Sequence, residues 1–448
     1  MGSPTFIFRW LGLLVTPALY SQSVVYVANY NSATIEAINS MTNAVMATIP
    51  TPQYPRLVAA APGGDRLYFV ADAPALLVAD TSTNTVVASV ALDGSPLAIA
   101  VAPSGARAYA VLVTGSGSSL AVVDLNSLTV LSSIPVCDGA YKIAMAPDGS
   151  RLYLMSGSTN AVCVFDPVVN AVTGTIALPP STVPTSSVVS ADGSRLYLAY
   201  TRAYYDPTAT GDHLAVIDVA TTSPIAVLDT PFGVYDLVLA PDGSRIYVPD
   251  GRTALVILDL NLATATGTIN LHAQAGRMVI SPEGRRIFVN YPYKTGAHIN
   301  YFDQTGVVDT LLGRELTTVT VGSFPMDLAL TPVLPPGRVF VDIRPNSLAN
   351  NVNPSGTDRI SVAVLSSPSF DASTVDRASI AFGRTGIEAP PLSCSPSLSD
   401  VNGDGLPDLV CDFDESATGF LSGDSTGYWT GRTVSGSQLR GFDAVNVQ

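Results

Sequence analysis

The sequence predicts an all-β protein, a seven-bladed β-propeller followed by a small β-sandwich-like domain. Three observations carry this prediction. A turn with the pattern Pro-x-Gly-x-Arg, or a close variant of it, recurs six times at spacings of 41 to 50 residues. Gly and Pro are frequent, at 36 and 33 of 448 residues, and only two of the 22 basic residues are lysine. The chain is 47% hydrophobic and 13% charged, which excludes disorder and disfavours a helical bundle.

The six turns share one local chemistry. Proline begins five of the six turns and presets φ, Asp bonds its own backbone where it is present, and Gly takes the position with positive φ in all six. The apolar strands on either side then pair as a hairpin. The turns are Pro62–Tyr68, Pro103–Tyr109, Pro147–Tyr153, Ala191–Tyr197, Pro241–Tyr247 and Pro282–Phe288.

Each hairpin is followed by two more predicted strands, so that one repeat makes a four-stranded blade. A third strand ends in Asp, as in Ala75–Asp80, and a fourth is rich in Thr and Val, as in Asn84–Val90. Six blades are complete, and a seventh inner strand at Met326–Thr331 has no hairpin partner after it. The missing strands lie at residues 24–30, 34–39 and 44–49, so we expect the two ends of residues 24–332 to share the last blade.

The segments Val27–Asn31 and Asn43–Ile49 resemble the YVTN-repeat family of β-propellers. The resemblance covers about residues 24 to 332. It implies a seven-bladed fold on an exported or cell-surface protein of bacteria or archaea. It implies no particular reaction, because one fold hosts many functions.

The first 21 residues predict an export signal. Arg9 supplies a positive charge, the apolar run Trp10–Tyr20 follows, and Ser21 and Ser23 are small enough for a cleavage region. The alternative is a buried first strand. No later segment is long and apolar enough to cross a membrane. We therefore expect a secreted, periplasmic or cell-surface protein. Its net charge of −14 disfavours nucleic acid and anionic lipid as partners.

Four cysteines suit an oxidising compartment. Cys394 and Cys411 flank one acidic loop and are the favoured disulfide, and Cys137 with Cys163 is a second pairing. Four buried free thiols are the alternative. The chain has no CxxC motif, which disfavours a structural zinc site.

The repeats end at a stiff linker, residues 333–337. Residues 338–448 differ in composition from the repeats. Segments such as Ile360–Leu365 and Asp400–Val410 predict short strands and turns. They resemble a β module that recurs at the C-termini of secreted bacterial multidomain proteins, for which no reaction is established.

This tail carries a candidate calcium loop. Calcium takes six to eight oxygen ligands, and Gly405 allows the sharp turn that wraps them round one ion. The loop resembles EF-hand, dockerin and thrombospondin-type loops, but Cys411 replaces the bidentate Glu of the EF-hand. A solvated acidic turn is the alternative. The predicted metal ligands are Asp400, Asn402, Asp404, the carbonyl of Leu406, and Asp408.

Two motifs that can indicate catalysis are weak here. Gly423–Gly427 matches GxSxG, but a nucleophile elbow needs a strand-to-helix turn and a histidine base, and the tail has no histidine. His213 and His298 open third strands of blades that are two steps apart. His272 lies between blades. We expect these histidines to be surface or packing residues.

The loops of one propeller face carry aromatic and charged residues that are candidates for ligand binding. Loops on a rigid scaffold commonly bind partners, and Tyr-rich faces suit glycans or proteins. Ordinary loop aromatics and ion pairs between blades are the alternative. The predicted ligand-binding residues are Tyr141, Lys142, Tyr204, Tyr205, Tyr235, Asp236, Arg277 and Tyr293.

These features predict an exported, non-enzymatic binding protein that recognises a protein or glycan partner, with calcium stabilising the tail. A secreted propeller enzyme of lactonase or lyase type is one alternative, and its residues would gather around Lys142, Asp236, Arg277 and His272. A structural cell-surface protein is a second alternative. The sequence does not predict the oligomeric state.

Overall fold

The computed structural model describes residues 23–202, 212–230, 234–292, 303–331, 339–345, 347, 350–367, 370–403, 405–422, 424 and 426–447. The predicted signal peptide at residues 1–21 and the linker at residues 333–337 lie outside this part of the chain. Within it, no helix is long and apolar enough to span a membrane.

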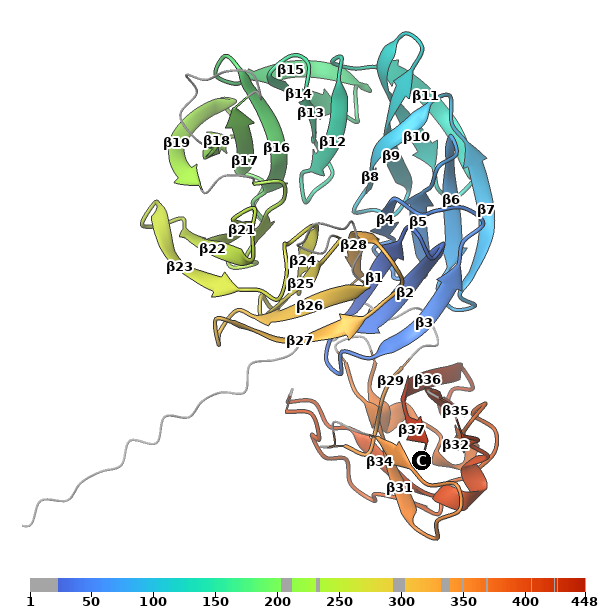
Figure 1. The fold of residues 1–448 in the computed structure, drawn as a ribbon. Coiled ribbons are helices and arrows are strands. Elements are labelled where there is room, and N and C mark those ends of the chain that lie inside the picture. Colours follow the sequence, from blue (N-terminus) through green and yellow to red (C-terminus); the bar gives the residue numbers. More distant parts are fainter. Residues whose placement is uncertain are drawn as a thin grey trace, which may run out of the picture.

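The chain forms a seven-bladed β-propeller, drawn in Figure 1 as a ring that runs from blue through green to orange. Each blade is a four-stranded antiparallel sheet. Blade one contains β4 (Leu57–Ala60), β5 (Arg66–Val70), β6 (Ala75–Asp80) and β7 (Thr85–Ala91). Blade two contains β8 (Ser95–Val101), β9 (Arg107–Thr114), β10 (Gly117–Asp124) and β11 (Thr129–Pro135). Blade three contains β12 (Ala140–Met145), β13 (Leu152–Ser156), β14 (Ala161–Asp166) and β15 (Ala171–Ala177). Blade four contains β16 (Thr182–Val189), β17 (Arg195–Arg202), β18 (Asp212–Asp218) and β19 (Ser223–Thr230). Blade five contains β20 (Val238–Leu239), β21 (Arg245–Pro249), β22 (Ala254–Asp259) and β23 (Thr264–Asn270). Blade six contains β24 (Met278–Ile280), β25 (Arg286–Asn290), β26 (Gln304–Asp309) and β27 (Arg314–Thr320).

The seventh blade is shared by the two ends of the propeller, as the strand count predicts. Its inner strand is β28 (Pro325–Thr331), which pairs antiparallel with β1 (Val24–Asn29). Then follow β2 (Thr34–Asn39) and β3 (Val45–Pro50). Tyr26 lies opposite Ala329 in the register that joins the ends. All six residues of β1 are buried, so this pairing is made inside the apolar core of the ring.

The repeated turns have the predicted backbone. Gly149 has a φ of 75°, and the carboxylate of Asp148 accepts the N–H of Ser150 at 2.9 Å. That bond and a second from the Ser150 hydroxyl lower the pKa of Asp148. The turn sets the hairpin locally, and this explains why the same short sequence recurs between the first and second strands of blades one to six.

Burial falls from the middle of each blade to its outer edge. All five residues of β13 are buried, because neighbouring blades cover both faces of the strand. Outer strands such as β11 alternate between exposed and half-buried positions. Apolar clusters join adjacent blades, and one such cluster contains Tyr197 of blade four with Ile246 of blade five. A disulfide from Cys137 to Cys163 ties the loop before β12 to β14.

The C-terminal module is β-sandwich-like. One sheet contains β29 (Phe340–Ile343), β31 (Arg359–Leu365), β34 (Leu409–Asp414) and β33 (Ser393–Cys394). The other contains β32 (Ala381–Gly383), β35 (Thr426–Arg432) and β36 (Gln438–Ala444), and β30 (Asn351–Val352) pairs with β37 (Asn446–Val447). Three short 3₁₀ turns complete it: Ala372–Thr374, Arg377–Ser379 and Glu415–Thr418. Trp429 is fully buried between the sheets, and a disulfide joins Cys394 to Cys411.

The module packs on the place where the ring closes. Phe340 and Leu365 belong to the same apolar cluster as Tyr26 of blade seven and Leu77 of blade one. Figure 1 shows the module in orange and red beside β3. The tail therefore covers the seam between the last and first blades.

Candidate functional site

One position in or just before each inner strand faces the central channel. In blades one to six it lies five residues before the first residue of the repeated turn, and in blade seven it is Asp327 of β28; we call these occupants the ring residues. Because all inner strands run in the same direction from the same face, the ring residues meet at one level of the channel. They are Leu57, Ala98, Lys142, Ser186, Asp236, Arg277 and Asp327, and all seven line one small cavity.

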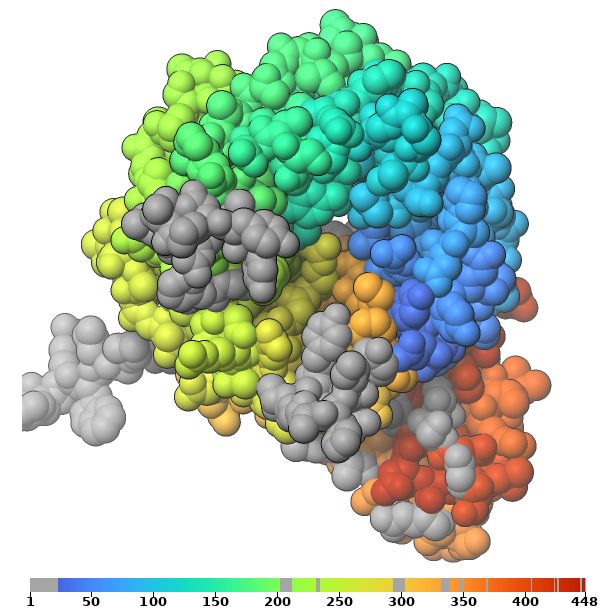
Figure 2. Space-filling model, turned by 45° about the horizontal axis from the view of Figure 1, so that its top comes forward, coloured from blue at the N-terminus to red at the C-terminus, as the bar shows by residue number. Residues whose placement is uncertain are grey.

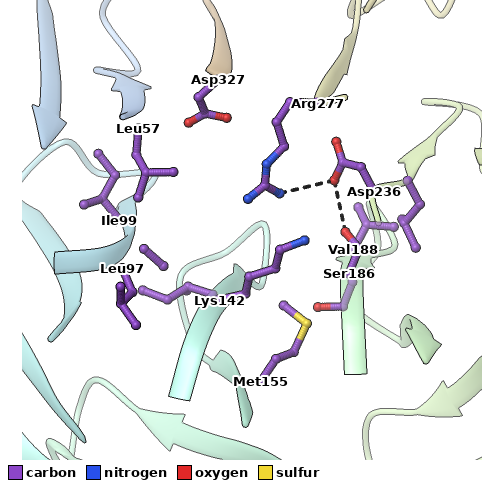
Figure 3. A pocket seen from close by; sticks show the side chains of 14 residues that line it. Leu57, Leu97, Ile99, Lys142, Met155, Ser186, Val188, Asp236, Arg277 and Asp327 are labelled. Carbon is purple, nitrogen blue, oxygen red and sulfur yellow. Dashed lines mark hydrogen bonds and ion pairs between the residues drawn. The ribbon is translucent and has the colours of Figure 1, made fainter. Parts of the chain in front are cut away.

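The channel has an apolar side and a charged side. Figure 3 shows Leu57, Leu97 and Ile99, from blades one and two, facing the charged side chains across the cavity. On the charged side, Nη1 of Arg277 lies 3.5 Å from Oδ1 of Asp236. The same carboxylate accepts the Ser186 hydroxyl at 3.1 Å and the backbone N–H of Met278 at 2.9 Å.

Lys142 is held by main-chain carbonyls. Its ammonium donates to the carbonyl of Thr185 and, at 2.8 Å, to the carbonyl of Tyr235. Burial, and then the positive charge of Arg277, lower the pKa of Lys142 to about 8. The lysine is therefore mostly charged at neutral pH, but it loses its proton far more easily than an exposed lysine.

The pKa of Asp327 is raised, whereas the pKa of Lys142 is lowered. Burial raises the pKa of this carboxyl to about 6, although Arg277 and the N–H of Val58 oppose the shift. Burial also works against the charge of Arg277, but Asp236 and Asp327 raise the pKa of that guanidinium. Two cations and two carboxylates thus balance one another around the axis.

The channel divides into two chambers, and Figure 2 shows the ring hollowed at its centre. The inner chamber, of about 220 Å³, is lined by the ring residues. The outer chamber, of about 710 Å³, is lined in part by residues that directly precede the ring residues. Its lining residues are Tyr141, Lys142, Val183, Thr185, Thr201, Tyr235, Gly276, Arg277, Pro292, Phe324 and Met326.

An aromatic cluster stands beside the outer chamber. The rings of Tyr30 and Tyr54 stack with centroids 5.2 Å apart, and Phe324 meets Tyr30 edge-on at 5.8 Å. The Tyr30 hydroxyl donates to Asp72 at 2.7 Å, which fixes the ring. Arg56, at the start of the first inner strand, is exposed and is not among the residues that line either chamber.

The structure brings five of the eight predicted ligand-binding residues together. Tyr141, Lys142, Tyr235 and Arg277 line the outer chamber, and Asp236 lines the inner one. Tyr235 is 63% exposed, whereas the Tyr141 hydroxyl donates to the carbonyl of Pro184 and holds that ring in place. The other three, Tyr204, Tyr205 and Tyr293, lie outside the described residues.

Thr185 is a site residue that the sequence reasoning missed. It is 8% exposed, it lines the outer chamber, and its hydroxyl has no hydrogen-bond partner. The signal was present in the repeat, because Thr185 occupies in blade four the position of Tyr141 in blade three and Tyr235 in blade five.

The described histidines stand apart from both chambers. The backbone N–H of His272 donates to Glu315, and its ring tilts against Tyr291. His213 lies 3.1 Å from Asp229 on the outer half of blade four. His298 is outside the described residues. His272 is not among the residues that line a chamber with Lys142 and Arg277.

The candidate calcium loop is held by its own backbone. Asp400 accepts the N–H groups of Gly403 and Gly405 at 2.7 and 2.9 Å, and both glycines have positive φ. Asp408 is fully buried and accepts N–H groups of Ser366 and Val401 at 2.8 and 3.0 Å.

The described part of the loop does not complete a metal site. No three His, Cys, Asp or Glu side chains are grouped to hold a metal ion among the described residues, and Asp404 lies outside them. Carboxylates are nevertheless crowded beside the loop. Burial, and then the like charges of Asp443 and Asp408, raise the pKa of Asp342 to about 7.

The ring of blades and its two chambers define a β-propeller whose channel mouth has aromatic walls and two cations. The solved structures that are similar to it include the following two. Hydrazine synthase of Kuenenia stuttgartiensis matches with a TM-score of 0.57 and 17% identity, over 68% of this chain and 99% of that one. A functionally unknown protein of Desulfotomaculum acetoxidans matches with a TM-score of 0.57 and 16% identity, over 70% of this chain and 99% of that one. At these identities the likeness shows the fold alone. No family model and no curated protein matched the chain.

Proposed function

We propose that this chain is an exported binding protein of the YVTN-repeat type, without enzymatic activity, whose propeller recognises a protein or glycan partner at the channel mouth. The observation that carries the proposal is the outer chamber. It has about 710 Å³, two cations, and aromatic walls, one of which is largely exposed at Tyr235. Pockets of this size with few polar groups are where ligands usually bind.

The charged groups of the channel are engaged in structural bonds, which favours binding over catalysis. Asp236 accepts two hydrogen bonds, from Ser186 and Met278, and Lys142 donates to two carbonyls. Histidine is absent from the described residues that line the chambers. The described residues of the chambers therefore supply no histidine general base.

An enzyme of lactonase or lyase type is a second candidate, and one observation favours it. Lys142 and Asp327 line the same small chamber and have pKa values of about 8 and about 6, which lie near the working range of acid–base catalysts. Turnover of a lactone or a polysaccharide that is abolished in Lys142→Met would establish this candidate.

Binding at the mouth is tested with two exposed residues of blade five. Tyr235 lies at the mouth, and Leu262 lies in the turn between β22 and β23, on the opposite face of the ring. The two side chains are 63% and 67% exposed, so neither change threatens the core. Binding to native cell-envelope fractions and to a glycan array should be saturable and should weaken in Tyr235→Ala. It should stay unchanged in Leu262→Ala, and equal effects of the two variants would refute the site.

For the C-terminal module we propose calcium as a stabilising ion. The support is the set of oxygen side chains at Asp400, Asn402, Asp404 and Asp408 around two glycines with positive φ. Calcium supplies positive charge to a region where Asp342, Asp408 and Asp443 repel one another.

A further inference from the structure

The two chambers differ in charge, although they share the same two cations. Lys142 and Arg277 line both chambers, whereas Asp236 and Asp327 line only the inner one. Among the described residues the outer chamber is therefore lined by positive charge alone. This is notable in a chain with a net charge of −14 and only two lysines, one of which is Lys142.

Both cations retain donors for a ligand. The ammonium of Lys142 has three N–H groups, and the structure assigns two acceptors to it, the carbonyls of Thr185 and Tyr235. The guanidinium of Arg277 has five N–H groups, and its ion pair with Asp236 is long at 3.5 Å. Figure 3 shows both side chains reaching toward the centre of the channel.

The hydroxyl of Thr185 is an independent sign of a ligand. Buried hydroxyls almost always have a hydrogen-bond partner, because a missing one costs free energy. Thr185 is more than nine-tenths buried, lines the outer chamber, and has no partner for its hydroxyl. This group stands directly beside the carbonyl that holds Lys142.

The remaining walls suit a ring with one apolar face and several hydroxyls. Tyr141, Tyr235 and Phe324 supply aromatic surface, and the bonded hydroxyl of Tyr141 keeps its ring in a fixed orientation. Rigid tyrosines offer contact area at small entropic cost. A sugar ring matches these walls, and a carboxylate on that ring matches the two cations.

From these four features we infer that the outer chamber binds an acidic glycan through the carboxylate of a hexuronate unit, held by Lys142, Arg277 and the hydroxyl of Thr185. This inference rests on the proposed binding function and specifies its ligand. The carboxylate is the discriminating group, and the sugar ring packs against the tyrosines.

Calorimetric titration of the full chain tests the inference with matched probes. The probes are tetramers of galacturonate, glucuronate and mannuronate, each compared with its methyl ester, which keeps the rings and removes the charge. We expect binding of at least one acid and at least tenfold weaker binding of its ester. A peptide with a free C-terminal carboxylate, and its amide, serve as the alternative source of the same chemical group.

Three variants connect the binding to the residues. Lys142→Met removes the charge, and Thr185→Val removes the hydroxyl while keeping the shape. Each should weaken uronate binding about tenfold or more. Arg56→Gln is the matched control, because it removes a positive charge on the same face outside both chambers. Thr185→Val should fold at least as stably as the parent chain, since it removes an unpartnered hydroxyl.

The outcomes separate the inference from the proposed function. Equal binding of acid and ester, binding of the peptide acid alone, or an equal loss in Arg56→Gln overturns the hexuronate inference and leaves a binding protein. If no probe binds but cell-envelope material still binds in a Tyr235-dependent way, the inference alone is wrong. If neither binds, the proposed function is wrong as well.

Discussion

The carboxylate of Asp327 in β28 accepts the backbone N–H of Val58 in β4 at 3.0 Å, and this bond joins the last inner strand of the ring to the first. Asp236 makes the same bond to Met278 of the next blade at 2.9 Å. The ring position therefore has two uses. An aspartate there connects neighbouring blades, and the same charge balances the cations that face the channel.

Replacing Asp327 tests the cost of its charge. Because burial raises its pKa to about 6, the folded protein binds this proton more tightly than the unfolded chain does. The contribution of Asp327 to stability is complete only below about pH 4 and is lost as the pH rises through 6. Asp327→Asn keeps the acceptor for Val58 and stays neutral. In urea unfolding we expect it to be more stable than the parent by about 1–3 kcal/mol near pH 7.5, and equal near pH 4.

A hydrophobic change at the same position is the control. Asp327→Leu leaves the N–H of Val58 without its acceptor and should destabilise the ring at both pH values by about 1–3 kcal/mol. A stability difference between the parent and Asp327→Asn that does not change with pH would show that Asp327 is ionised normally in the folded protein.

The effect of Lys142 on stability changes with pH in the opposite direction to that of Asp327. The charged groups that face it are Arg277, Asp236 and Asp327, and its pKa is lowered to about 8. The folded chain releases this proton more easily than the unfolded chain, so the charge costs stability at neutral pH. The cost disappears as the pH rises from about 8 toward the ordinary value. Relative to Lys142→Met, the parent should gain about 1–2 kcal/mol between roughly pH 7 and pH 10, as measured by urea unfolding. A constant difference over this range would contradict the assignment.

The disulfide of the C-terminal module should stabilise that module alone. Cys394 and Cys411 are 17 residues apart, and closing a loop of this length stabilises the folded state by about 3 kcal/mol. The chain has two tryptophans, of which Trp10 lies in the predicted signal peptide and Trp429 is buried in the module. In the chain without residues 1–21, tryptophan fluorescence therefore follows the module. Changing both cysteines to Ser should lower its melting temperature.

The second disulfide serves as the comparison. Replacing Cys137 and Cys163 by Ser changes blade three and should leave the melting transition of Trp429 in place. A shift of that transition as large as the one caused by loss of Cys394 and Cys411 would mean that ring and module unfold together.

Calcium is expected to raise the melting temperature of the module. The same Trp429 signal is measured with EDTA, with millimolar calcium and with millimolar magnesium, since extracellular calcium modules bind in about this range. We expect calcium to shift the transition upward, magnesium to have a smaller effect, and Asp404→Ala to abolish the calcium shift. If neither EDTA nor Asp404→Ala moves the transition, the loop is an acidic turn without a metal.

The blades could be predicted because their determinants are local. Each turn carries its own glycine, five of the six begin with proline, and Gly149 and its counterparts take the positive φ that the hairpin needs. Counting the strands was then enough to place Tyr26 in the same sheet as Ala329. The residues that face the channel followed from the same periodicity, and Lys142, Asp236 and Arg277 do meet there.

The contacts within the site could not be predicted, because they join residues that are remote in sequence. The Asp327 carboxylate accepts a hydrogen bond from Val58, which is 269 positions away in the sequence. The sequence around either residue does not indicate this pairing. The sequence predicts Tyr141 as a ligand-binding aromatic, but it does not show that the Tyr141 hydroxyl is bonded to the carbonyl of Pro184 in the next blade. Whether a hydroxyl such as that of Thr185 finds a partner depends on side-chain packing, which a repeat pattern does not specify.

Sharing one blade between the two ends imposes an order on biogenesis. A nascent or translocating chain presents β1 to β3 first, and their partner β28 emerges only after all the other blades. Until then β1 keeps an open edge that invites pairing with a foreign strand. A chain truncated before residue 325 would keep that edge open, so incomplete copies should aggregate or require a chaperone. In complete copies β28 pairs with β1 and closes the ring in the final step.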